Sequence, residues 1–99
     1  MCKSEIFATI LQTVSQETEI PPEQILSRKK DEETVDARYL LVYMLKRNGF
    51  CSSRVASCIR KDIRTVNLIL TRFEARKSSR RYFGILLDKI KKQLGNRGF

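Results

Sequence analysis

Apolar residues recur at intervals of three and four along almost the whole chain, and no stretch shows the strict alternation that is typical of a β-strand. The first repeat predicts a helix with Ser4 as its N-cap and an apolar face formed by Ile6, Ile10, Leu11 and Val14. Glu19–Pro22 is predicted to end this helix. A short second helix is expected from Pro22 to Leu26, because proline at the first helical position loses no hydrogen bond.

The longest apolar run, Tyr39–Leu45, predicts the central helix of the protein. This helix is expected over Glu33–Arg47, with acidic residues at its start, where the helix dipole favours negative charge. Asn48 and Gly49 predict its end. The run is too short to span a bilayer, so it predicts a buried core helix and no membrane segment.

The second half of the chain predicts three more helices. A short helix with a serine cap is expected over Ser52–Ile59, followed by a tight turn and a longer helix capped by Asp62. The longer helix has an apolar face of Val66, Ile69, Leu70 and Phe73. The last helix is expected from about Ser79, with a frayed tail over 95–99 and with inward residues Phe83, Leu86, Leu87, Ile90 and Leu94. The pattern predicts a single all-α domain over residues 1–99, folded as a small helical bundle.

The net charge of +9 at pH 7 is distributed unevenly along the chain. Residues 1–33 carry four Lys and Arg against seven Asp and Glu, whereas residues 34–99 carry sixteen against four. Such a basic segment favours a polyanionic partner, either nucleic acid or an anionic membrane surface. One basic cluster fits either a solvated helix end or contacts with a phosphate backbone, and it comprises Arg72, Arg76, Lys77, Arg80 and Arg81.

The chain has little of the chemistry that an enzyme or a metal site needs. It contains no histidine, and its three cysteines, Cys2, Cys51 and Cys58, form no C-x-x-C pair. We therefore expect no metal site, no cofactor and no catalysis. An odd number of cysteines without a secretory leader predicts reduced thiols and a cytoplasmic protein.

A short helix, a tight turn and a second helix with a polar N-terminus make up the layout of a helix-turn-helix. In such a unit the second helix enters the major groove of DNA, with its apolar back anchored and its first turns facing the bases. Ile63, Arg64 and Asn67 occupy those first turns. Arg64 can pair with a guanine edge, Asn67 with an adenine, and Ile63 can touch a thymine methyl group. Many helical hairpins share this spacing, so the spacing alone does not single out DNA.

Three stretches of the chain share a pattern with one known family. Ser27–Lys30 followed by Asp36–Leu45 is similar to a run S-R-K-R…R-A-R-x-x-A-M-Y-L-L, and Ile20–Ser27 is similar to a segment I-S-V-E-D-L-L-S. Lys61–Val66 falls in place of a signature R-D-H-T-T-V. Together they resemble the C-terminal DNA-binding domain (domain IV) of the bacterial DnaA replication initiators. The resemblance covers nearly the whole chain and implies a Trp-repressor-like bundle of helices that binds double-stranded DNA.

The resemblance also implies roles for individual residues. Arg38 matches the family arginine that reaches the minor groove, and this role is favoured over that of a surface arginine on the central helix. Lys61 matches an arginine that contacts phosphate, and Thr65 matches a residue that contacts the DNA backbone. Asp62 matches a base-reading residue, a role that is compatible with capping the helix. The predicted DNA-binding surface is completed by the start of the short helix, at Ser52, Ser53 and Arg54.

The chain departs from the family at the signature itself. Ile63 stands where the family has histidine, Arg64 where it has the first threonine, and Ile59-Arg60 where it has two glycines. These differences predict an altered target sequence, in which Arg64 prefers a guanine. The chain contains no G-x-x-x-x-G-K-[S/T] phosphate loop, so we expect no ATPase module. The prediction is a stand-alone, nucleoid-associated regulator of replication or transcription.

A second interpretation keeps the scaffold and changes the partner. The chain would then be a helical adaptor that binds a protein, for example a replication initiator, through exposed Ile63 and Leu68. RNA binding is less favoured, because the basic helices carry no row of stacking aromatic residues. Attachment to a membrane surface is less favoured because the last helix has no tryptophan and its apolar face fits a core.

Overall fold

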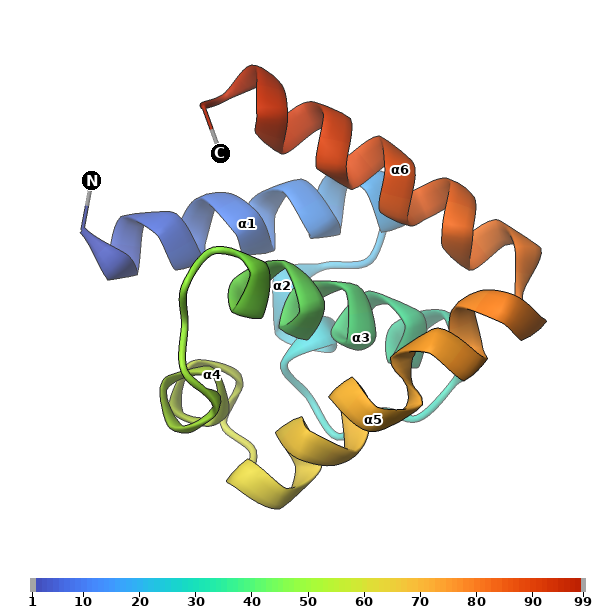
Figure 1. Cartoon of the computed structure of the whole chain (residues 1–99), viewed down its shortest axis with the longest axis horizontal. Coiled ribbons are helices and arrows are strands. Elements are labelled where there is room, and N and C mark those ends of the chain that lie inside the picture. Colours follow the sequence, from blue (N-terminus) through green and yellow to red (C-terminus); the bar gives the residue numbers. More distant parts are fainter. Residues whose placement is uncertain (1, 99) are drawn as a thin grey trace.

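The structure, a computed structural model, describes residues 2–98, and these residues form six helices and no β-strand (Figure 1). This confirms the all-helical prediction, and the helices pack as a bundle. Their bounds are α1 (Lys3–Thr18), α2 (Pro22–Ile25), α3 (Glu32–Arg47), α4 (Ser52–Ile59), α5 (Ile63–Ser79) and α6 (Arg81–Asn96).

Helix α3 lies at the centre, and α1, α2, α4 and α5 all pack against it (Figure 1). Helix α6 runs back along α1 and meets α5 at a corner. Aromatic rings join three of these helices. The ring of Phe73 in α5 stacks on Tyr43 of α3 at 4.3 Å between centroids and meets Phe83 of α6 edge-on at 5.3 Å. The C-terminal half of α5 is therefore fixed on both sides, while its N-terminal half packs beside α4.

The apolar run at residues 39–45 is covered on nearly all sides. Five of its residues are buried, while Tyr39 and Tyr43 are half-buried. The run is thus a core helix segment, as predicted. No helix within residues 2–98 has the length and apolar character needed to cross a membrane.

The predicted inward faces of the later helices are also confirmed. Val66, Ile69 and Phe73 of α5 are buried, and Leu70 is half-buried against the same core. All five predicted inward residues of α6, from Phe83 to Leu94, are buried. Burial of apolar residues at this helical spacing explains why the two helices form. Helices of this length gain most of their stability from packing one apolar face.

Several predicted helix ends are confirmed by specific caps. The side chain of Asp31 accepts a hydrogen bond from the backbone N–H of Thr34 and caps α3, which begins at Glu32 rather than Glu33. Gly49, with φ of +91°, follows the end of α3 in the left-handed region that glycine tolerates best. Pro22 opens α2, as predicted, but α2 ends at Ile25 and not Leu26.

Three other predicted ends are wrong. Cys2 and not Ser4 is the N-cap of α1, and Lys3 in the added turn donates to the carbonyl of Gly49. Cys51 and not a serine is the N-cap of α4, and no side chain caps that helix. Helix α6 begins at Arg81 and continues to Asn96, because buried Leu94 anchors its last turn. The expectation of a frayed tail is therefore wrong for Gly95 and Asn96, which are helical, and Phe99 lies outside the described residues.

Four salt bridges join α3 to the junction of α5 and α6. Asp36, whose side chain is 4% exposed, accepts from Nε of Arg76 at 2.6 Å and from Nη2 of Arg80 at 2.7 Å. Both arginines also pair with Glu32. Two members of the predicted basic cluster thus serve the fold, while Arg72, Lys77 and Arg81 are exposed.

Candidate nucleic-acid interface

A three-residue turn connects α4 to α5 and fixes where α5 begins. Ile59 at the end of α4 is buried, and Arg60 adopts left-handed backbone angles (φ 60°, ψ 38°). The backbone N–H of Lys61 then donates to the carbonyl of Ala56 at 3.0 Å, which closes the end of α4. The turn therefore depends on a conformation that non-glycine residues adopt at a cost.

Asp62 caps α5, as predicted. Its Oδ1 accepts from both the backbone N–H and the hydroxyl of Thr65, each at 2.8 Å. These two bonds, the backbone one first, lower the pKa of the Asp62 carboxyl below its ordinary value. Thr65 itself is half-buried, and its hydroxyl is used in this bond to Asp62.

The first turns of α5 have the two-sided character that the sequence predicts. Ile63, Arg64 and Asn67 are exposed, Ile63 to 47%, while Val66 and Ile69 are buried on the opposite side. Every salt bridge found within residues 2–98 involves Arg76 or Arg80. The guanidinium of Arg64 is thus free of ion pairs.

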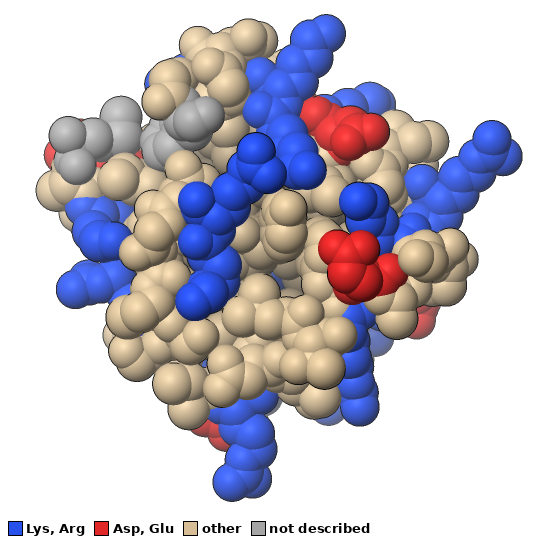
Figure 2. Space-filling view, viewed as in Figure 1, with Lys and Arg blue, Asp and Glu red and all other residues tan. Residues whose placement is uncertain are grey.

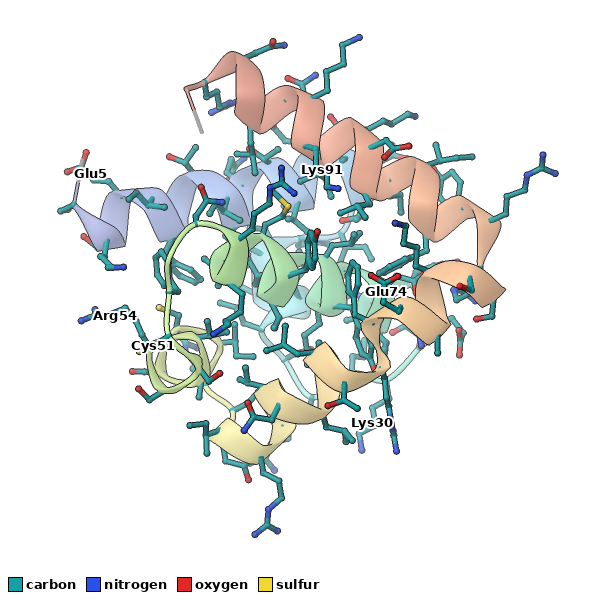
Figure 3. All side chains as sticks on the ribbon, in the orientation of Figure 1. Glu5, Lys30, Cys51, Arg54, Glu74 and Lys91 are labelled. Carbon is teal, nitrogen blue, oxygen red and sulfur yellow. The ribbon has the colours of Figure 1, made fainter. Side chains whose placement is uncertain are left out.

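A cleft of about 540 Å³ lies beside this part of α5, between α5, α3 and the 27–30 segment. Its lining contains no acidic residue and consists of Arg28, Lys30, Val35, Arg38, Tyr39, Lys61, Thr65, Leu68, Ile69 and Arg72. We call it the basic cleft. Lys30 lies beside the middle of α5 (Figure 3), across the cleft from Leu68 and Arg72. Five cations without an acid in one concave site attract an anion.

Arg38 lies deep in this cleft, with only 7% of its surface exposed. Its Nε donates to the carbonyl of Ile25 at 3.0 Å, and its Nη2 donates to the carbonyls of Ser27 and Lys29 at 2.7 and 3.1 Å. Burial lowers the pKa of the guanidinium. The interpretation of Arg38 as a surface arginine is wrong, because the 25–29 backbone folds over it.

Lys61 is half-buried at the edge of the same segment. Its Nζ donates to the carbonyl of Ser27 at 3.0 Å, the carbonyl that Arg38 also contacts. The pKa of Lys61 is lowered, first by burial and then by repulsion from Arg38, Arg28 and Lys30. Arg38 and Lys61, to which the resemblance to the DnaA family assigns DNA contacts, therefore point toward protein backbone in this structure.

The start of α4 lies apart from the basic cleft. Ser53 and Arg54 line a separate hollow of about 300 Å³ together with Cys51, Ser57 and Cys58. Arg54 extends from α4 on the side away from α5 (Figure 3). Ser52 is half-buried in the first turn of α4. The structure thus groups Lys61, Asp62 and Thr65 with α5 and leaves Ser53 and Arg54 outside that group.

The basic cleft is also lined by residues outside the predicted DNA-binding set, of which Arg72 was considered only within the basic cluster and Leu68 only for a protein partner: Arg28, Lys30, Leu68 and Arg72. A signal for three of them was available in the sequence. Arg28 and Lys30 stand in the segment that resembles S-R-K-R, and Arg72 follows Thr65 and Leu68 at helical spacing.

The surface over α5, at the lower centre of Figure 2, is mainly uncharged and is bordered by Lys and Arg side chains.

Comparison with protein-family models and with curated proteins finds no match to the chain. Within residues 2–98, no group of His, Cys, Asp and Glu residues is placed to hold a metal ion.

Proposed function

We propose that this protein binds double-stranded DNA in a sequence-specific manner, with α4, the following turn and α5 acting as a helix-turn-helix. The observation that carries the proposal is the placement of Arg64 and Asn67, both exposed and without a side-chain partner within residues 2–98, next to a basic cleft whose described lining has no acid. Base-reading side chains and phosphate-binding cations are the two parts that such a protein needs.

The first turns of α5 supply the base contacts in this proposal. Arg64 donates two hydrogen bonds to a guanine, Asn67 pairs with an adenine, and Ile63 packs on a thymine methyl group. Phosphates on the flank of the groove bind Arg28, Lys30 and Arg72 at the rim of the basic cleft. Asp62 keeps its N-cap role, and its second carboxylate oxygen is free to accept from a base.

We further propose that the chain is related to the C-terminal domain of the DnaA initiators and shares its Trp-repressor-like arrangement. The left-handed backbone at Arg60 supports this, because the resemblance places the second of two glycines at that position. The role that fits this relation is a regulator of replication or transcription.

Binding-site selection from a pool of random duplexes tests the proposal. The wild-type protein is expected to enrich a sequence that contains a guanine whose contact is lost in Arg64→Ala. One bidentate contact is worth about 1–3 kcal/mol, so the substitution should weaken binding to the selected site by about 5- to 150-fold. Lys89→Ala, which removes an exposed cation from α6, is the matched control and should change binding less than twofold.

Two results of that selection would count against the proposal. Enrichment of the ordinary DnaA recognition box would contradict an altered target, because Ile63 cannot replace the hydrogen bonds of histidine. Failure to enrich any sequence would contradict sequence-specific binding altogether.

A protein partner is the second candidate, and one observation favours it. Ile63 and Leu68 expose 47% and 45% of their surfaces on α5, where the surrounding surface is mainly uncharged. Exposed apolar residues of this kind mark protein-binding sites when they are contiguous. Such an adaptor would bind its partner with little dependence on salt, which distinguishes it from a DNA-binding protein.

A further inference from the structure

We infer that Arg38 and Lys61 are positioning residues, which hold the 27–30 segment in the conformation that presents Arg28 and Lys30 to DNA, and that Arg38 does not itself contact DNA. The inference rests on the proposed function for its DNA-binding part. Its structural part, that these two side chains order the segment, stands without DNA.

The 27–30 segment is not helical, so its backbone carbonyls have no hydrogen bonds within a helix. Arg38 donates to those of Ser27 and Lys29 and also to the carbonyl of Ile25 at the end of α2, and Lys61 adds a second donor on Ser27. The Ser27 hydroxyl completes the network: it donates to the carbonyl of Gln24 and accepts from the backbone N–H of Lys29. The segment is thus fixed from α3 on one side and from the turn before α5 on the other.

The available donors of Arg38 argue against a second role in DNA. The single N–H of Nε and both N–H groups of Nη2 match the three carbonyl contacts of Arg38. Only Nη1 remains, on a side chain that is 93% covered. Turning the Arg38 side chain toward a minor groove would break these bonds and leave the carbonyls of Ile25 and Lys29 without the donors they have here, which is unfavourable.

The consequence for binding follows from the positions of the exposed cations. Arg28 and Lys30 alternate along the chain with the held carbonyls of Ser27 and Lys29, and both line the basic cleft. Because their backbone is already ordered, binding a phosphate does not require ordering the segment at the same time. Loss of Arg38 should therefore weaken DNA binding through Arg28 and Lys30.

The first experiment is limited proteolysis of the free protein by trypsin, which cleaves after Arg28, Lys29 and Lys30 when the segment is mobile. Arg38→Met keeps an unbranched side chain but has no donors, and it should speed cleavage at these three sites at least tenfold. Arg38→Lys should fall between Met and wild type. Arg47→Met, an exposed arginine on the same helix, is the matched control and should leave the rate unchanged.

Circular dichroism on each variant separates a loosened segment from global unfolding. If Arg38→Met does not fold, Lys61→Met removes one donor of the same network and should speed cleavage at the same three sites, to a smaller extent. A folded Arg38→Met or Lys61→Met protein that is cleaved no faster than wild type would overturn the inference.

The second experiment is a double-mutant cycle on duplex binding. If Arg38 acts through the segment, Arg38→Met weakens binding of the wild-type chain but changes binding less than twofold in an Arg28→Ala, Lys30→Ala background. Equal losses in both backgrounds would show that Arg38 contacts DNA directly and would overturn the inference. If the wild-type protein binds no duplex, the proposed function fails, and the tryptic cleavage rates still decide whether Arg38 orders the segment.

Discussion

Single polar side chains that bond to the backbone set most of the local geometry around α5. Asp62 caps the helix, while Arg38 and Lys61 hold the 27–30 segment beside it. The resemblance to the DnaA family assigns DNA contacts to the same three residues. In this structure each of them already has a protein partner, so their effect on binding combines positioning with any direct contact.

The caps at Asp31 and Asp62 make stability depend on pH in the acid range. Both pKa values are lowered in the folded protein from 3.8, because hydrogen bonds from Thr34 and Thr65 favour the charged carboxylates. As the pH falls below about 3.8, the unfolded chain takes up these protons first, so the stabilisation is present above pH 3.8 and is lost as the pH drops through the lower folded values.

Thermal unfolding of wild type and Asp62→Ala at pH 5 and pH 3 checks this prediction. The variant should melt at a lower temperature at pH 5, and its melting temperature should fall less between the two pH values than that of wild type. Equal falls for the two proteins would show that Asp62 does not contribute to the acid sensitivity.

Arg60 offers a prediction about backbone strain. Its side chain is exposed and its φ is +60°, so Arg60→Gly removes a strained conformation without removing a buried contact. The gain is partly offset by the greater entropy of glycine in the unfolded chain, and we expect a net stabilisation of about 0.5 kcal/mol. Urea denaturation measures it. Lys89→Gly, within α6, is the opposing control and should destabilise by about 1 kcal/mol.

At the scale of helices, the position of α5 depends on its two ends. Its C-terminal end is fixed to α3 by the ring stack of Tyr43 and Phe73 and by the salt bridges from Asp36. Its N-terminal end is fixed by the turn after α4 and by the Asp62 cap. The exposed residues of its first turns are therefore held at a defined angle to α3 and the 27–30 segment.

The ion-pair network predicts a large effect for a single carboxyl group. Asp36→Ala leaves Arg76 and Arg80, whose side chains are only 17% and 33% exposed, with the exposed Glu32 as their remaining partner. Because both arginines can turn partly to water, we expect a loss of about 2 kcal/mol of unfolding free energy rather than the upper range for buried pairs.

Chemical denaturation of Asp36→Ala beside Asp88→Ala measures this loss. Asp88 is exposed on α6, so its substitution should change stability by less than about 0.5 kcal/mol. Similar stabilities for the two variants would show that the network does not join the helices.

Apolar spacing predicted the helices and their inward faces, because each buried face repeats within a few residues of sequence. The cap at Asp62 was predictable for the same reason, since its bonds to Thr65 are local. The Asp36 network and the Arg38 contacts were not, because they join residues 9 to 44 positions apart whose pairing no local pattern encodes. The basic cleft was missed because it forms only when Arg72 of α5 meets the 27–30 segment.

At the scale of the whole molecule, charge is divided between structure and surface. Arg76 and Arg80 are used inside the fold, and Arg38 and Lys61 hold backbone. The remaining cations that line the basic cleft or stand in the first turns of α5 are Arg28, Lys30, Arg64 and Arg72, which have no ion-pair partner within residues 2–98. The net charge therefore overstates the number of phosphates that one bound duplex can neutralise at this face.

The salt dependence of duplex binding tests the central proposal most directly. Fluorescence anisotropy on a labelled duplex, titrated at several salt concentrations, gives the slope of log affinity against log salt. The three cations proposed to contact phosphate, Arg28, Lys30 and Arg72, each neutralise one phosphate and predict a slope of about −2.7. A slope near zero, or no binding at the lowest salt concentration, would contradict DNA binding and favour a protein partner on the same surface.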